Sequence, residues 1–99
     1  MEDQETNVTI RFIGSLRSIA GKDKLNIEST GAFTIKECIE KIVSKIPRIE
    51  KVLIDSEIQD PRLNTLILLN GKEVDVLNGL DTQAEGGDEV VLISVLHTG

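Results

Sequence analysis

Apolar and polar residues alternate over several short stretches of the chain, and one longer stretch between them has a helical repeat. The segment "NVTIRFIG" places Val8, Ile10 and Phe12 on one side of a strand and polar residues on the other. The segment "KLNIES" alternates in the same way. We expect two neighbouring antiparallel strands, joined by "SLRSIAGKDK" as a loop.

The stretch after these two strands predicts an amphipathic helix. Thr34 and Glu37 have the T-x-x-E spacing of a capping box, which starts a helix. Pro47 ends it, because proline has no backbone N–H to donate, and "RIEKVLID" is expected to form a short helical turn. Between these limits the apolar residues recur at steps of three and four and form one stripe: Ile35, Cys38, Ile39, Ile42, Val43 and Ile46.

The second half of the chain predicts three more strands. The unbroken run "LILL" is typical of a strand that is covered on both faces and lies inside a sheet. Asn70–Gly71 predicts a type I′ hairpin turn, because both central positions of that turn need positive φ, and Val74 and Val76 continue the alternation. The segment "VVLISVL" is too apolar for an edge strand, so we expect the first and last strands to lie side by side at the centre.

These elements predict one α+β domain, which agrees with the length of 99 residues. Their order is β-β-α-β-β-β, with about five strands of a mixed sheet packed on one main amphipathic helix. We expect residues 1–7 to be a flexible N-terminus, residues 8–93 to form the domain, and residues 94–99 to form an extended tail.

Composition excludes several functions. The net charge of −6, with no Trp or Tyr, argues against direct nucleic-acid binding, which needs clustered cations and stacking aromatic rings. One cysteine and one histidine form no cluster with the ligand spacing of a zinc site, and no apolar stretch has membrane-spanning length. Cys38 lies on the apolar stripe and His97 lies in the tail, so no catalytic pair is expected and the chain is predicted not to be an enzyme. A reducing cytoplasm is the expected location.

Four stretches in this order carry a resemblance to a known family. They are "VTIRFIGSLRSIAGK", "TIKECIEKI", "LILLNGKEV" and "GLDTQAEGGDEVVLIS", the last followed by a short tail that ends in glycine. Together they resemble the ubiquitin-like β-grasp family of sulfur carriers and protein modifiers, which includes the MoaD/ThiS group and the ubiquitin-related modifier group. The tail "ISVLHTG" is more similar to the modifier group, where His precedes the final pair.

The resemblance implies that the carboxylate of Gly99 is adenylated by a ubiquitin-activating-type enzyme and then converted by a sulfur donor to a thiocarboxylate. ATP is used by that partner, and this chain is expected to bind no cofactor and no metal. The sulfur would serve tRNA thiolation or cofactor synthesis, or the protein would be joined to lysines of other proteins. The residues expected to contact the partner are Thr98, His97, Leu96, Val95, Leu66 and Leu68.

Two alternatives remain open on the sequence. One is a MoaD-type small subunit of molybdopterin synthase, whose tail would enter the large subunit. The other is a non-catalytic β-grasp binding module with an inactive tail. One difference from the family pattern suggests this second alternative. Members of the family normally end in Gly-Gly, whereas this chain ends in Thr98–Gly99.

Overall fold

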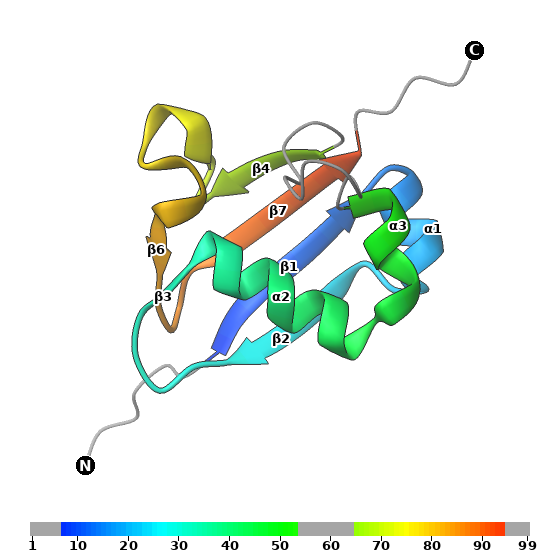
Figure 1. The fold of residues 1–99 in the computed structure, drawn as a ribbon, viewed down its shortest axis with the longest axis horizontal. Helices are drawn as coiled ribbons and strands as arrows, with labels where there is room; N and C mark the ends of the chain where they lie inside the picture. The colour runs from blue at the N-terminus through cyan, green and yellow to red at the C-terminus, as the bar shows by residue number, and fades with distance from the viewer. Residues whose placement is uncertain (1–6, 54–64, 95–99) are drawn as a thin grey trace.

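A pair of parallel strands forms the centre of the molecule. The computed structural model describes residues 7–53 and 65–94 (Figure 1). Within them, β1 (Asn7–Ile13) and β7 (Glu89–Ser94) are hydrogen-bonded neighbours in a five-stranded sheet of order β2-β1-β7-β4-β5. The predicted central position of the first and last strands is therefore confirmed, as is the α+β class.

The other strands of this sheet pair antiparallel to the central two. β2 (Lys24–Glu28) pairs with β1 as expected, and β4 (Thr65–Leu69) pairs with β7. β5 (Lys72–Glu73) closes the predicted Asn70–Gly71 hairpin, in which both turn residues have positive φ, 50° and 88°. The sheet is thus mixed, with one parallel pair at its middle.

Two predictions about the connecting segments were wrong. The expected loop after β1 contains α1 (Ser15–Ala20), whose Leu16 and Ala20 are buried. The expected alternation at Val74 and Val76 is a 3₁₀ turn, η3 (Val74–Val76), which leaves Val76 73% exposed. Six residues are too few for the sequence period to distinguish a helix from a loop with two buried anchors.

Three further short elements belong to the fold. β3 (Phe33–Thr34) and β6 (Gln83–Ala84) form a separate two-stranded sheet that the sequence did not predict. η4 (Gly79–Asp81) precedes β6 and is a single 3₁₀ turn.

The predicted capping box starts the main helix, α2 (Ile35–Lys45). The Glu37 N–H donates to Thr34 Oγ1 at 3.1 Å, and the Thr34 N–H donates to Glu37 Oε1 at 2.9 Å. These bonds satisfy N–H groups that have no acceptor within the helix. After Pro47 the chain continues through η1 (Pro47–Ile49) and α3 (Glu50–Leu53), which agrees with the expected short helical turn.

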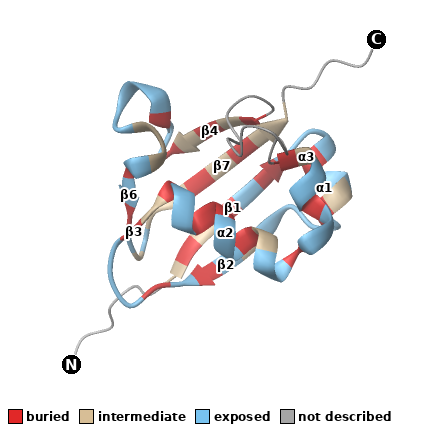
Figure 2. Ribbon diagram, viewed as in Figure 1, coloured by how far each residue is buried: buried red, intermediate tan, exposed pale blue. Residues whose placement is uncertain are grey.

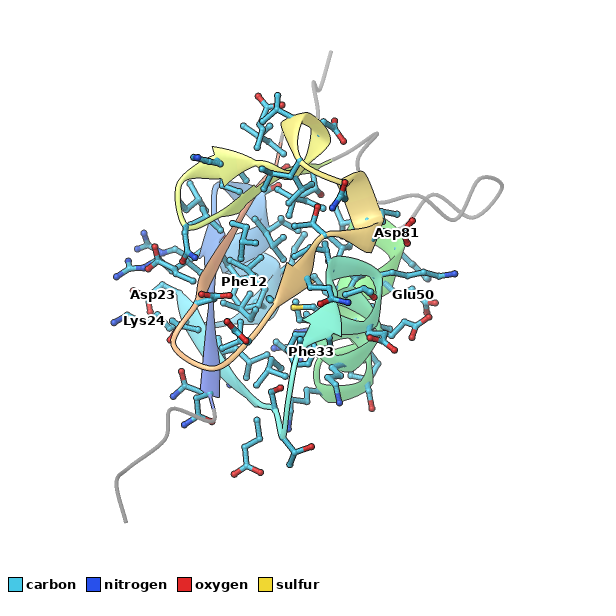
Figure 3. The ribbon with its side chains drawn as sticks, turned by 90° about the vertical axis from the view of Figure 1, so that its left-hand side faces the viewer. Phe12, Asp23, Lys24, Phe33, Glu50 and Asp81 are labelled. Carbon is cyan, nitrogen blue, oxygen red and sulfur yellow. The ribbon has the colours of Figure 1, made fainter. Side chains whose placement is uncertain are left out.

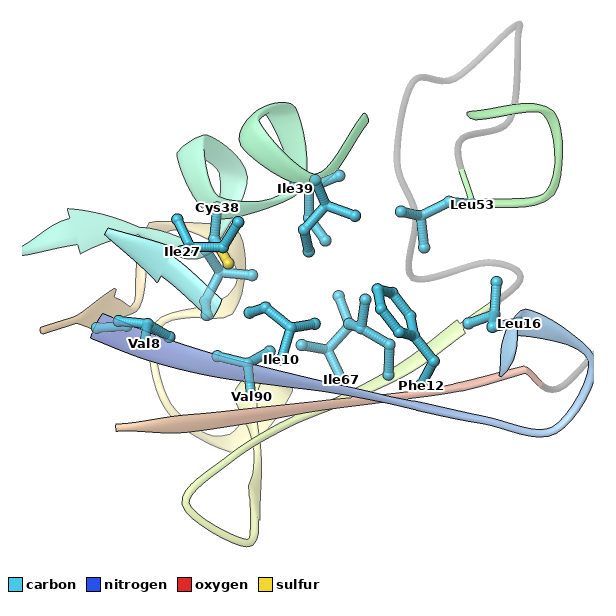
Figure 4. Close-up of a cluster of buried hydrophobic side chains, with 14 of the residues drawn as sticks. Val8, Ile10, Phe12, Leu16, Ile27, Cys38, Ile39, Leu53, Ile67 and Val90 are labelled. Atoms are coloured by element: carbon cyan, nitrogen blue, oxygen red, sulfur yellow. The ribbon is translucent and has the colours of Figure 1, made fainter. Parts of the chain in front are cut away.

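The core lies between one face of the sheet and the helices (Figures 2 and 4). From the sheet, Ile10, Phe12 and Ile67 point toward the layer of helices, as the close-up shows, and each is at most 2% exposed. Charged side chains such as Asp23 and Lys24 lie at the periphery (Figure 3). No helix in the described part of the chain has the length and apolar character needed to cross a membrane.

Cys38 is part of this core and not a reactive thiol. Its side chain is fully buried on the inner face of α2. Burial raises the pKa of the Cys38 thiol from 9.0 to about 12, and the nearby Lys41 ammonium offsets only part of that rise. The prediction that Cys38 fills space in the core is consistent with both observations.

We expect the substitution Ile39→Asp to unfold the domain. Ile39 is 2% exposed on the inner face of α2, so the change removes a packed side chain and buries an unpaired carboxylate. The free energy of unfolding should fall by more than about 3 kcal/mol, measured by urea denaturation. Glu40→Ala on the exposed face is the matched control and should change it by less than about 0.5 kcal/mol. A cooperatively folded Ile39→Asp protein would contradict this orientation of α2.

We expect Cys38 to resist alkylation in the folded protein. Iodoacetamide reacts with the thiolate, and the raised pKa together with complete burial keeps Cys38 protonated and out of reach at neutral pH. Intact-mass measurement should show no adduct on the native protein and one adduct after denaturation. Rapid labelling of the native protein would show that α2 opens readily.

Candidate functional site: the end of the central strand

The predicted site lies where β7 ends. Ser94 is the last residue of this strand and the last described residue of the chain. On one side it pairs with Thr65 at the start of β4. The predicted partner-binding and activated residues that follow it lie outside the described residues: Val95, Leu96, His97, Thr98 and Gly99.

The face of the sheet that is turned away from α2, here called the open face, carries an apolar row beside this strand end. Three residues from adjacent strands are aligned across it, Ile13 of β1, Ile93 of β7 and Leu66 of β4. Ile13 is 44% exposed, and the other two are partly exposed. No helix of the described chain covers this row, so it offers apolar surface next to the root of the tail.

Leu66 and Leu68, both predicted to contact a partner, belong to the open face. They alternate along β4 with Thr65, Ile67 and Leu69, which are buried. Leu66 and Leu68 are partly exposed, so the expectation that "LILL" is covered on both faces was wrong. β4 is interior because it has a strand on each edge, while only one of its faces is buried.

The opposite end of the open face is polar. The Arg11 guanidinium and the Glu89 carboxylate form an ion pair across β1 and β7, with 2.6 Å between Nε and Oε2. Both side chains are more than 40% exposed, so the pair contributes little to stability. The open face is therefore graded, from charged groups at the start of β7 to apolar groups at its end.

The turn before β7 is built by side-chain hydrogen bonds. Asp88 accepts from the Glu85 N–H at 2.9 Å and from the Asn70 side-chain amide at 3.0 Å. The Asn70 side-chain oxygen in turn accepts from the Glu89 N–H at 2.9 Å. These bonds close the turn and tie the start of β7 to the β4–β5 hairpin.

The sequence did not predict a corner formed by Gly14 and Ser15 at the end of β7. Gly14 has φ 78° and ψ −145°, which only glycine adopts readily, and it turns the chain from β1 into α1. A Cβ on Gly14 would lie 3.6 Å from the Ser94 Cβ, so this backbone lies against the strand end. The Ser15 hydroxyl donates to Ser94 Oγ at 2.8 Å. A glycine directly after a strand was the only sequence signal.

The described residues offer no catalytic machinery at this end. They contain no group of His, Cys, Asp and Glu that could hold a metal ion. Two hollows between β2 and α2 share the polar residues Glu28, Lys41 and Ser44. Glu28 pairs with Asn7 at the start of β1, so the hollows lie at the other end of the sheet from Ser94. The arrangement can present an apolar surface to another protein.

Comparisons with known proteins agree with this fold. Urm1 from Trypanosoma brucei is similar with a TM-score of 0.80 and 22% identity, over 99% of this chain and 100% of that one. SAMP1 from Haloferax volcanii gives 0.81 and 18%, over 94% and 99%. A chain of the Amycolatopsis orientalis BexX/CysO complex gives 0.70 and 25%, over 93% and 99%. A search of curated proteins by sequence found no match.

A family model described as Urm1 (Ubiquitin related modifier) matches residues 7–99. Members of this family are small ubiquitin-like carrier proteins. The match includes both central strands, α2 and the tail, and it agrees with the ubiquitin-like β-grasp architecture of the structure. This chain therefore belongs to the Urm1 family of ubiquitin-related modifiers.

Proposed function

We propose that this protein is a sulfur carrier and protein modifier whose Gly99 carboxylate is activated by a partner enzyme. A ubiquitin-activating-type enzyme joins that carboxylate to the α-phosphate of ATP, and pyrophosphate leaves. Hydrosulfide supplied by a sulfur donor then displaces AMP from the acyl-adenylate, and the product is the thiocarboxylate. The thiocarboxylate delivers sulfur, or the activated protein is joined to a lysine of another protein.

The family match over residues 7–99 carries this proposal, because it includes the segment that would be activated. The geometry supports it in two ways. β7, the central strand, ends at Ser94, five residues before Gly99, and the apolar row of Ile13, Ile93 and Leu66 lies beside that end. The BexX/CysO complex is an instance of a similar protein bound to a partner. Under this proposal the chain itself binds no cofactor, ATP is bound by the partner, and the reaction takes place in the cytoplasm.

The sulfur recipient separates the proposal from its nearest alternative. A pterin recipient would make this chain the small subunit of a molybdopterin synthase, in a stable complex with a large subunit. Loss of tRNA thiolation after gene deletion, or copies attached to lysines, would favour the carrier and modifier role. A binding module with an inactive tail would show neither result and would keep its function without Gly99.

Intact-mass measurement tests the proposal directly. The purified protein is incubated with ATP, a sulfur donor and lysate from its own cells. We expect a mass gain that equals the replacement of one oxygen by sulfur, and no gain when ATP is omitted. An unchanged mass, in a lysate that activates a relative ending in Gly-Gly, would contradict the proposal.

We expect deletion of Thr98 and Gly99 to abolish ATP-dependent activation, because the reacting carboxylate moves two residues back along the chain. The thermal unfolding midpoint should not change, since the deletion leaves the core intact. Thr98→Gly is the matched variant and should keep or improve activation, because it restores the Gly-Gly end of the family pattern. Activation of the truncated protein would remove Gly99 from its proposed role.

We expect Ile93→Glu to weaken docking to the activating enzyme without unfolding the domain. The substitution places a charge at the middle of the apolar row on the open face, where it stays in contact with solvent. The KM for this protein should rise by about tenfold or more, which equals about 1.4 kcal/mol of binding. Asn26→Glu adds the same charge on the open face at β2, away from the row, and should leave KM unchanged. Equal effects of the two variants would contradict a specific role of the row.

A further inference from the structure

The corner of Gly14 and Ser15 supports the last residue of β7 on the side where strand pairing has ended. The parallel register of β1 and β7 stops at Ile13 and Ile93, because Gly14 turns the chain away into α1. Ser94 therefore has a strand partner in β4, through Thr65, and no residue of β1 opposite it. On the side without a strand partner, the Ser15 hydroxyl donates a 2.8 Å hydrogen bond to Ser94 Oγ.

The Ser15 side chain is carried by a rigid element. Leu16 and Ala20 anchor α1 in the hydrophobic core, where both are 0% exposed. At its other end Arg48 donates from Nε to the Ile19 carbonyl at 2.6 Å and from Nη2 to the Ala20 carbonyl at 2.7 Å. These bonds satisfy carbonyls that the helix end leaves free and tie α1 to η1. A contact from a fixed helix restricts the direction in which the chain leaves β7.

We infer that Ser15, with Gly14, is a positioning residue for activation of the tail. This inference rests on the proposed function. Five residues separate Ser94 from the end of Gly99, so an extended tail reaches at most about 17 Å. A rotation of about ten degrees at its root then displaces the carboxylate by about 3 Å, and misplacement by even about 1 Å can cost a large part of a reaction rate.

The role predicts an effect on turnover and not on docking. The open-face row binds the partner in the same way whether or not Ser94 is held. Without the hydrogen bond, the bound protein presents its carboxylate in more directions, and fewer of them allow attack on ATP. The rate at saturation should therefore fall while KM is unchanged.

The test is ATP–pyrophosphate exchange by the purified cognate activating enzyme, measured against the concentration of this protein. Ser15→Ala and Ser94→Ala should each lower kcat by about three- to tenfold, the range expected for loss of one hydrogen bond. The double variant should be no slower than either single one, because both remove the same bond. Ser15→Thr keeps the hydroxyl and should restore kcat. Ser18→Ala, on the exposed side of α1, is the control and should match the native protein.

Normal kcat in Ser15→Ala and Ser94→Ala, with exchange by the native protein intact, would overturn this inference and leave the proposed function standing. So would an effect confined to KM, or an additive loss in the double variant. Absence of exchange with the native protein would instead reject the proposed function, and the inference with it. Thermal unfolding of each variant separates a positioning effect from loss of fold, and Ser94→Ala tests the same bond from its other partner.

Discussion

The parallel pairing of β1 and β7 is the constraint on which the rest of the structure depends. It joins the first and last strands of the described chain by backbone hydrogen bonds, so the five-stranded sheet is complete only when both strands are in place. The core-facing residues of both strands form the surface on which α2 packs. Four of them are 0% exposed: Val8, Ile10, Val90 and Leu92. One pairing therefore closes the sheet, builds the core and places the end of β7 at a defined point.

The same pairing explains the gradient on the open face. On the open face, the residues of β1 and β7 are charged or polar where the two strands begin and apolar where they end. On β7 they run from Glu89 to Ile93. A sheet with only one covered face needs polar residues on the other to remain in solution. Here the apolar residues gather at the end nearest the tail, where β1, β7 and β4 each contribute one.

Those parts of the fold that depend on short-range patterns were predicted from the sequence. The capping box of Thr34 and Glu37 and the turn at Asn70–Gly71 are complete within four residues, and the structure has both. The helix α1 and the 3₁₀ turn η3 were missed because tertiary contacts decide them. The bond from Ser15 to Ser94 joins residues 79 positions apart, which no local pattern predicts. Of the predicted site residues, only Leu66 and Leu68 lie in the described structure, and their exposure on the open face could not be read from an unbroken apolar run.

The burial of Cys38 has a consequence for copies of the protein that meet in the cell. Under the proposed function, the acyl-adenylate formed at the carboxyl end is open to attack by an accessible thiolate, which would displace AMP. The only thiol of this chain, that of Cys38, is buried on the inner face of α2, and its raised pKa keeps it protonated. If the protein is activated as proposed, one folded copy therefore has no thiolate with which to capture the acyl-adenylate of another, and the packing that stabilises α2 also prevents this side reaction.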